Sequence, residues 1–357
     1  MGEFDFHGHF GRLQESCPAE FAFRGTAADD VRAWQQPFRA RLREVLGMVN
    51  LERDLAGHVP DAEMLDSTDM GSYTRESWRI RTEPTVPLPC YLLRPKDAPP
   101  DPPLVLTPHG HGHPHVYVGL FDSPEEEAQI SEGERDIAVQ AVQQGYLVIA
   151  PTTRAFGDTR APADKEKGAV SSCRLQLMHD LLLGRTPIGD RVWDMSRLID
   201  WAIEHQGVDP ARIAITGNSG GGTVSLFAAA CDTRISVAVP GCYFNTFAGS
   251  IGSIIHCDCN YVPGILRLGE MHDIAGLTAP RPFLAVAGRD DPIFPVAHTR
   301  AAFEQLVRIY RAAGVRGRCE LYVGNGGHRY YKERVWPFIA KAFGPTRTPP
   351  RKPRTSR

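Results

Sequence analysis

The 357-residue sequence lacks several features that mark particular classes of protein. Its charges nearly balance, with 40 Lys and Arg against 42 Asp and Glu, so no basic field favours a nucleic-acid partner. No apolar run approaches about 18 residues, so we expect no membrane-spanning helix and no membrane partner. Residues 1–7 show neither a basic segment nor an apolar core, so the sequence predicts no secretory signal and a cytoplasmic location. No internal repeat is visible.

The eight cysteines show no spacing typical of a disulfide framework. Several, such as Cys231 and Cys242, lie among apolar residues, so we expect reduced and buried thiols. Cys257 and Cys259 are separated by a single residue, which is closer than in an ordinary zinc pair, and no second pair accompanies them. We therefore predict no metal site there.

Short apolar runs alternate with amphipathic segments along most of the chain. The alternation predicts an α/β fold with a doubly wound, mostly parallel sheet flanked by helices. The expected strands are residues 77–81, 88–94, 104–107, 146–150, 213–216, 235–239, 282–287 and 319–323, and the main expected helices are residues 27–48, 132–144, 191–205, 223–231, 299–313 and 333–343.

Three parts of unequal length are predicted from these elements. Residues 1–74 form an N-terminal helical arm packed on the main domain, because the helix expected at 27–48 carries an apolar stripe. Residues 75–344 form the catalytic domain. Residues 345–357 are rich in proline and arginine and predict a disordered basic tail.

The stretch around Ser219 carries the strongest motif. A buried strand at 213–216 leads into Gly217-Asn218-Ser219-Gly220-Gly221, and an alanine-rich helix follows. Strand, G-x-S-x-G and helix in this order predict a nucleophile elbow, where the serine occupies a strained turn and its neighbours must be small. A glycine-rich turn with a serine by chance is the alternative, and the two flanking elements argue against it.

An activated serine needs a base, and the base needs a carboxylate to hold its tautomer. Asp291 follows the strand at 282–287, and His328 follows the last strand at 319–323. The order Ser219, Asp291, His328 is the order of α/β-hydrolase triads. The sequence therefore predicts these three residues as the catalytic set.

An oxyanion hole requires two N–H donors. We expect one from the backbone of Gly220 and the other from the backbone of His111, in the loop after the strand at 104–107. The alternate histidines of that loop could instead hold a metal, although the H-x-H-x-D-H pattern of binuclear hydrolases lacks its aspartate here. These histidines are His109, His111, His113 and His115.

Over residues 75–343 the chain resembles the α/β-hydrolase superfamily, in particular its acetyl xylan esterase and dienelactone hydrolase-like branch. It departs from acetyl xylan esterases at His111, where they often carry Tyr, and at Gly220, where they often carry Gln. The matching features are His109-Gly110-His111-Gly112, Arg154-x-x-Gly157, Gly217-x-Ser219-x-Gly221, Gly288-x-x-Asp291-x-x-x-Pro295, Gly327-His328, and Cys259 to Gly264 leading to Ala279 to Pro282.

The resemblance implies a serine carboxylic-ester hydrolase that acts on short-acyl, acetyl-type esters without a cofactor. A small-molecule or carbohydrate ester is the expected partner, and a homo-oligomer is compatible with the sequence. We include His109, Arg154 and Tyr261 as candidate substrate-binding residues. The alternatives are a peptidase of the prolyl-oligopeptidase kind, a metal-dependent hydrolase that uses the histidine-rich loop, and a non-catalytic binding module.

Two further expectations concern local detail. The long segment 243–273 is predicted to overhang the site and to set substrate choice, because it is too long for a simple connection. Asp290 neighbours Asp291, but counting three residues from Gly288 and four back from Pro295, as in the related esterases, gives Asp291 as the acid.

Overall fold

The computed structural model describes residues 4–344, and the tail expected at 345–357 lies outside this range. Its described residues build one mixed sheet in the order β1-β2-β3-β5-β4-β6-β7-β8-β9. The strands are β1 (Ala62–Asp69), β2 (Tyr73–Glu83), β3 (Val86–Pro95), β4 (Leu104–Leu106), β5 (Leu147–Pro151), β6 (Ile213–Asn218), β7 (Val237–Gly241), β8 (Phe283–Gly288) and β9 (Cys319–Gly324).

The sheet has an antiparallel half and a parallel half. β1, β2, β3 and β5 pair antiparallel, with Trp78 of β2 opposite Cys90 of β3. From β5 through β9 every pairing is parallel, and Leu106 of β4 lies between Ile149 and Ile215. The parallel strands therefore bring their carboxyl ends to one edge of the sheet, which is where ligands bind in open α/β sheets.

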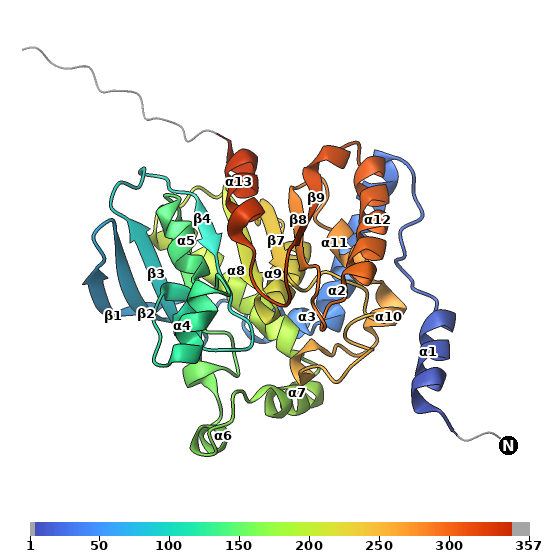
Figure 1. Cartoon of the computed structure of the whole chain (residues 1–357), viewed down its shortest axis with the longest axis horizontal. Helices are drawn as coiled ribbons and strands as arrows, with labels where there is room; N and C mark the ends of the chain where they lie inside the picture. Colours follow the sequence, from blue (N-terminus) through green and yellow to red (C-terminus); the bar gives the residue numbers. More distant parts are fainter. Residues whose placement is uncertain (1–3, 345–357) are drawn as a thin grey trace, which may run out of the picture.

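Helices cover both faces of the parallel half, as Figure 1 shows. The longer ones are α2 (Ala28–Val45), α8 (Pro187–His205), α9 (Gly220–Cys231), α12 (Val296–Ala312) and α13 (Lys332–Phe343). The shorter ones are α1 (Phe6–Ser16), α3 (Met48–Asp54), α4 (Pro124–Ser131), α5 (Ile137–Gln143), α6 (Pro162–Glu166), α7 (Cys173–Leu182), α10 (Ile265–Leu268) and α11 (Met271–Gly276), with 3-10 turns η1 (Pro114–Val118), η2 (Gly157–Thr159), η3 (Asp258–Asn260) and η4 (Arg316–Arg318).

Successive residues of a strand point to opposite faces, and here they enter two separate apolar cores. Leu104 and Leu106 of β4 join the core built with α2, α8, α9, α11 and α12. Val105, between them, joins the core built with α5 and α13. The strands are buried on both faces, which explains their continuous apolar runs and confirms the doubly wound α/β prediction. Among residues 4–344, no helix combines the length and the apolar character needed to cross a bilayer.

The expected N-terminal arm packs on the main domain through α2. Phe38 and Leu42 of this helix are fully buried in the larger core. Arg39 donates hydrogen bonds to the backbone carbonyls of Ala230 and Leu277, which close the carboxyl ends of α9 and α11. The arm is therefore part of the folded body.

Three details of the fold differ from the expectations. β1 was not predicted, because almost every side chain of Ala62–Asp69 is exposed and the segment shows no apolar alternation. Its presence, and the start of β2 at Tyr73, place the beginning of the sheet before the boundary expected at residue 75. The helix expected at 132–144 starts later, as α5 at Ile137, because residues 132–136 form a turn after α4 in which Glu134 has a positive φ of 53°.

Candidate active site

Ser219 lies on a sharp turn between β6 and α9. Its backbone angles are φ 58° and ψ −118°, a strained combination for a residue with a side chain. The strain is held in place by close packing on both sides, because a Cβ atom at Gly217 or Gly221 would lie 2.3 or 2.1 Å from the carbonyl oxygen of Pro108. The motif needs small residues here because the chain that leaves β4 approaches the turn so closely. The turn places Ser219 at the carboxyl edge of the sheet.

Asp291 and His328 meet beside this turn. They follow the parallel neighbours β8 and β9, and Nδ1 of His328 lies 2.7 Å from Oδ2 of Asp291. The other carboxylate oxygen accepts hydrogen bonds from the backbone N–H groups of Ile293 and Phe294, at 2.9 and 3.1 Å. Burial alone would raise the pKa of Asp291, but these partners hold it below its usual value. The carboxylate is therefore charged and aimed at the imidazole.

Asp290 points elsewhere. Its side chain is 63% exposed and lies near Arg289, whereas Asp291 is 4% exposed. The structure thus brings Asp291, and not its neighbour, to His328.

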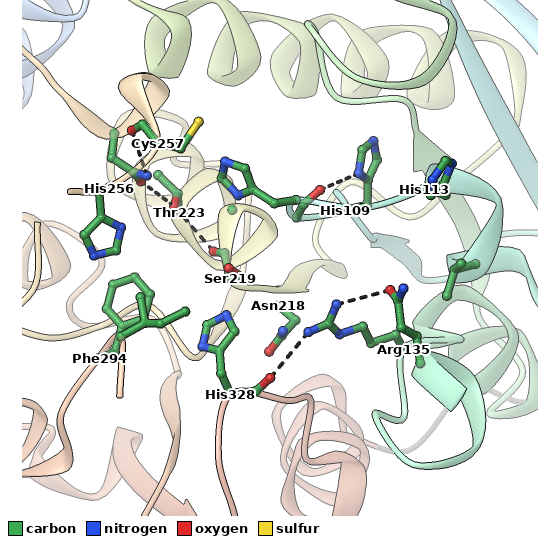
Figure 2. A pocket seen from close by; sticks show the side chains of 18 of the residues that line it. His109, His113, Arg135, Asn218, Ser219, Thr223, His256, Cys257, Phe294 and His328 are labelled. Carbon is green, nitrogen blue, oxygen red and sulfur yellow. Dashed lines mark hydrogen bonds between the residues drawn. The ribbon is translucent and has the colours of Figure 1, made fainter. Parts of the chain in front are cut away.

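Ser219 and His328 line one cavity of about 360 Å³. Figure 2 shows their side chains next to each other, with Phe294 and His256 on one side and Arg135 on the other. The ring of Phe294 stacks on that of His328, with centroids 5.8 Å apart and planes at 23°. This stacking and the bond to Asp291 fix the imidazole on both sides.

The loop after β4 packs directly against the elbow. A Cβ at Gly110 would lie 2.5 Å from the Asn218 carbonyl oxygen and 3.2 Å from Cβ of Ser219, so only glycine allows this approach. The backbone N–H of Gly220, the first residue of α9, lies in the same place, at the positive end of the helix dipole. The two expected oxyanion donors, Gly220 and His111, therefore belong to segments in contact beside Ser219.

The ring of His109 fixes the orientation of this loop through two hydrogen bonds to the backbone. Its Nε2 accepts the backbone N–H of Thr153 at 2.8 Å, which leaves the ring proton on Nδ1 to donate to the carbonyl of Gly110 at 2.7 Å. Burial and nearby positive charge lower the pKa of His109 to about 3, so the ring is neutral. Because the C=O and N–H of a trans peptide point in opposite directions, holding the Gly110 carbonyl fixes the direction of the His111 N–H. Both ring nitrogens are used, so His109 positions the loop and has no polar atom left for substrate.

The four histidines of the loop separate into different environments. His109 bonds the backbone, and His111 places Nε2 3.6 Å from the thiol of Cys259. His113 and His115 both lie beside Glu126, at 3.4 and 3.0 Å. The row does not converge on one point, which argues against the alternative of a catalytic metal held by these four residues.

Arg154 does not line the cavity. Its guanidinium is buried and donates two hydrogen bonds to Asp194, at 2.7 and 2.6 Å, and a third to Asp190 at 3.3 Å, with Glu83 as a further partner. These carboxylates, from the end of β2 and from α8, hold the pKa of Arg154 well above its usual value despite the opposing effect of burial. The expected substrate-binding role is therefore corrected: the side chain joins β2, the loop after β5 and α8.

Tyr261 lies next to the site but in a different hollow. It is 40% exposed, its hydroxyl donates to the carbonyl of Ile251 at 3.3 Å, and it lines an apolar groove beneath α1. The cavity that holds Ser219 is lined instead by Ile254 to Cys257 and by Asn260. The middle of the segment 243–273 thus forms a wall of the site, while Phe244 and Phe247 belong to the main core.

Two polar residues of the cavity were missed from the sequence. His256 leaves Nε2 buried without a hydrogen-bond partner, and its pKa is lowered by burial and by neighbouring histidines. Arg135 contacts Gln129 and the carbonyl of His328, at 3.2 and 3.4 Å. Neither lies in a motif, so no sequence signal could have selected them over the other histidines and arginines.

Comparison with known proteins agrees with this architecture. Residues 140–248, which contain the elbow, match the family model described as acetyl xylan esterase (AXE1). A Bacillus subtilis (strain 168) protein named "Putative hydrolase YtaP" is 26% identical over 249 residues, covering 67% of this chain and 77% of the relative. A solved structure from Bacteroides fragilis, described as a "putative acetyl xylan esterase", superimposes with a TM-score of 0.74 at 15% identity, covering 96% of this chain and 90% of the other.

The chain has the α/β-hydrolase fold. Two further solved structures share it, a glucuronoyl esterase from Solibacter usitatus (TM-score 0.65, 14% identity, covering 92% and 98% of the two chains) and an acetyl xylan esterase from Paenibacillus sp. R4 (TM-score 0.56, 17% identity, covering 92% and 98%). At these identities the structural likeness establishes the fold alone. Taken with the family match around Ser219, the comparisons support a carboxylic-ester hydrolase.

Proposed function

We propose that the chain hydrolyses short-acyl carboxylic esters through a triad of Ser219, His328 and Asp291. The observation that supports this most is the 2.7 Å contact between His328 Nδ1 and the buried Asp291, at a cavity that also holds the strained Ser219. This contact places the ring proton on Nδ1, so Nε2 has a free lone pair for the serine proton.

In the first half-reaction, Ser219 Oγ attacks the ester carbonyl carbon while His328 Nε2 takes its proton. The negative oxygen that forms is stabilised by the backbone N–H groups of Gly220 and His111. His328 then gives the proton to the leaving alkoxide, the C–O bond breaks, and the acyl group remains on Ser219. In the second half-reaction, water loses a proton to His328 Nε2 and attacks the acyl carbon. His328 then gives that proton to Ser219 Oγ as the bond between Oγ and the acyl carbon breaks, which releases the carboxylic acid and restores the serine.

The size and the lining of the cavity favour an ester with a small acyl group and a polar alcohol. Its volume of about 360 Å³ lies near the lower end for ligand pockets, and the rings of Phe294 and Tyr117 contribute apolar surface. Arg135 and the unpartnered Nε2 of His256 offer hydrogen-bond donors or acceptors to hydroxyl groups. An acetylated carbohydrate or a similar small polar ester fits this chemistry, in line with what the acetyl xylan esterases named above are described as cleaving.

A panel of esters tests the proposal. We expect p-nitrophenyl acetate and an acetylated xylo-oligosaccharide to be cleaved, p-nitrophenyl dodecanoate to be a poor substrate, and Ser219→Ala to be inactive on all of them. A preference for the dodecanoate would contradict the short-acyl assignment. Activity of the Ser219→Ala variant close to that of the unaltered protein would contradict the serine mechanism. The cytoplasmic location and a homo-oligomeric state remain predictions of the sequence.

A further inference from the structure

A cluster of three thiols and one imidazole lies beside the cavity that holds Ser219, and two of its members, His111 and Cys257, line that cavity. It consists of Cys173 at the start of α7, Cys257 and Cys259 around η3, and His111 in the loop after β4. Their four ligand atoms all lie within 4.8 Å of one another. No part of the triad belongs to this group, so the proposed reaction leaves it unexplained.

Two distances within the cluster are close to those of a tetrahedral metal site. Zinc bonds of about 2.3 Å to sulfur and about 2.0 Å to nitrogen place the atoms of a Cys₃His site roughly 3.5–3.8 Å apart. Here Sγ of Cys257 and Cys259 are 3.4 Å apart, and Nε2 of His111 is 3.6 Å from Sγ of Cys259. Cys173 and Cys259 are 1% and 2% exposed, so the cluster is largely shielded from solvent.

A buried cation beside the cluster lacks a carboxylate partner. Arg191 of α8 is 2% exposed, and its Nη2 contacts the thiol of Cys173 at 3.4 Å and the carbonyl of Arg154 at 3.0 Å. Within residues 4–344 no acidic side chain forms an ion pair with it, and its Nε has no hydrogen-bond partner. A buried guanidinium is costly without a compensating negative charge.

We propose that Cys173, Cys257, Cys259 and His111 bind one zinc ion as a structural site. Binding releases three thiol protons to solvent, so Zn²⁺ and three thiolates carry a net charge of −1, which Arg191 balances. Four protein ligands fill the tetrahedron and leave no position for water, so the ion has no catalytic role. The site ties the cavity wall at 257–259 to the loop that carries the second oxyanion donor.

One consequence concerns His111. With Nε2 bound to the metal, its ring proton must reside on Nδ1. That nitrogen faces the elbow, because a Cβ at Gly220 would lie 3.2 Å from it. Since this space is filled by the ring of His111, the position after the nucleophile has no room for a longer side chain such as the glutamine of related esterases.

The test is the metal content of the full chain, purified without a histidine tag and under a reductant, and measured by plasma mass spectrometry. We expect about one zinc per chain, lost in the variants Cys173→Ser and Cys257→Ser. Cys231→Ser is the matched control, since Cys231 is buried in α9 outside the cluster, and it should retain the metal. Zinc-free wild-type protein that takes up no Zn²⁺ on titration would overturn the proposal, as would full zinc content in both cluster variants.

Cobalt substitution gives a readout that does not depend on how well the variants fold. Wild-type protein loaded with Co²⁺ should show thiolate-to-cobalt charge transfer and the intense visible bands of tetrahedral coordination, and weak octahedral bands would contradict the assignment. Ser219→Ala should keep both the zinc and the cobalt spectrum while losing activity. A metal-free protein with an active triad would therefore refute this inference alone, and an inert protein with zinc would refute only the proposed function.

Discussion

The two walls of the active-site cavity are built in different ways. One wall consists of residues that directly follow parallel strands: Ser219 after β6, Asp291 after β8 and His328 after β9. The hydrogen-bonded sheet sets their positions. The elbow is held by close backbone contacts, such as the packing of Gly221 against the carbonyl group of Pro108. The other wall is formed by the loops at 109–113 and 254–260, which lie outside the hydrogen-bonded sheet.

This difference separates the proposed triad from most of the surface that would surround the substrate. A sheet edge fixes atoms with little freedom, as the proposed proton transfer from Ser219 to a His328 ring oriented by Asp291 requires. A wall of loops can change its side chains without disturbing the sheet, so it is the place where substrate preference can vary. The proposed zinc site would give this second wall the rigidity that the sheet gives the first. Substitutions in each wall should therefore have different consequences.

Removing the nucleophile should produce the largest effect. Ser219→Ala should lower kcat by about 10⁶-fold, because a triad acts as a unit. The fold should persist, since only one oxygen atom is removed from the turn, and thermal unfolding would verify this. Ser225→Ala is the matched control: Ser225 lies in the same helix and donates to the Gly221 carbonyl at 2.7 Å, so its loss should leave kcat near that of wild type. Equal losses in both variants would mean that the helix, and not the Ser219 hydroxyl, limits the reaction.

Replacing the acid that follows β8 should have the second-largest effect on kcat. Asp291→Asn keeps the shape of the side chain but favours the wrong tautomer of His328, and kcat should fall about 10⁴-fold. Asp290→Asn should change kcat little, because the Asp290 side chain is 63% exposed and points away from His328. Steady-state kinetics on one short ester compares the two. A reversed order would show that the carboxylate contacting His328 is not the one that supports catalysis.

The same contrast explains what could be predicted from the sequence. The parallel strands and the elbow follow from local patterns, since buried strands need apolar runs and the turn at Ser219 needs small neighbours. β1 could not be predicted, because its side chains are exposed and carry no alternation. The cysteine cluster was also missed. Cys173 is 84 residues before Cys257 (257 − 173), and only the tertiary fold brings these two thiols close together.

Arg154 shows that a sequence motif alone does not determine the role of a residue. It follows a strand, as a site residue should, yet it lies in an ion cluster with Asp194, Asp190 and Glu83. Arg154→Met should leave the buried Asp194 without an ion-pair partner, whereas Glu83 and Asp190 keep Arg185, and it should lower the free energy of unfolding by about 3–5 kcal/mol. Arg53→Met, which breaks a pair whose arginine side chain is 69% exposed, should cost within about 0.5 kcal/mol. Denaturant unfolding measures both changes.

Kinetics on the same variant decides between structure and substrate binding. The folded fraction of Arg154→Met should keep its KM, because the guanidinium does not line the cavity. A tenfold rise in KM with an unchanged unfolding midpoint would restore the substrate-binding role. It would contradict the assignment of this residue to a structural role outside the cavity.

The smallest effect should come from His109, which links the two walls by orienting the loop that carries His111. Its pKa is lowered from 6.5 to about 3 in the folded state, so below pH 6.5 the unfolded chain binds a proton that the folded chain does not. The stabilisation from the neutral ring is complete above pH 6.5 and is lost as the pH falls, by about 2 kcal/mol at pH 5. The slope of unfolding free energy against pH, measured in wild type and in His109→Gln, isolates this group. The glutamine can still accept from Thr153 and donate to Gly110, so it should reduce the slope by about one proton, whereas His179→Gln, at an exposed position of α7, should not. An identical slope in wild type and His109→Gln would mean that His109 is protonated in the folded protein, and the fixed direction of the His111 N–H would then lack its support.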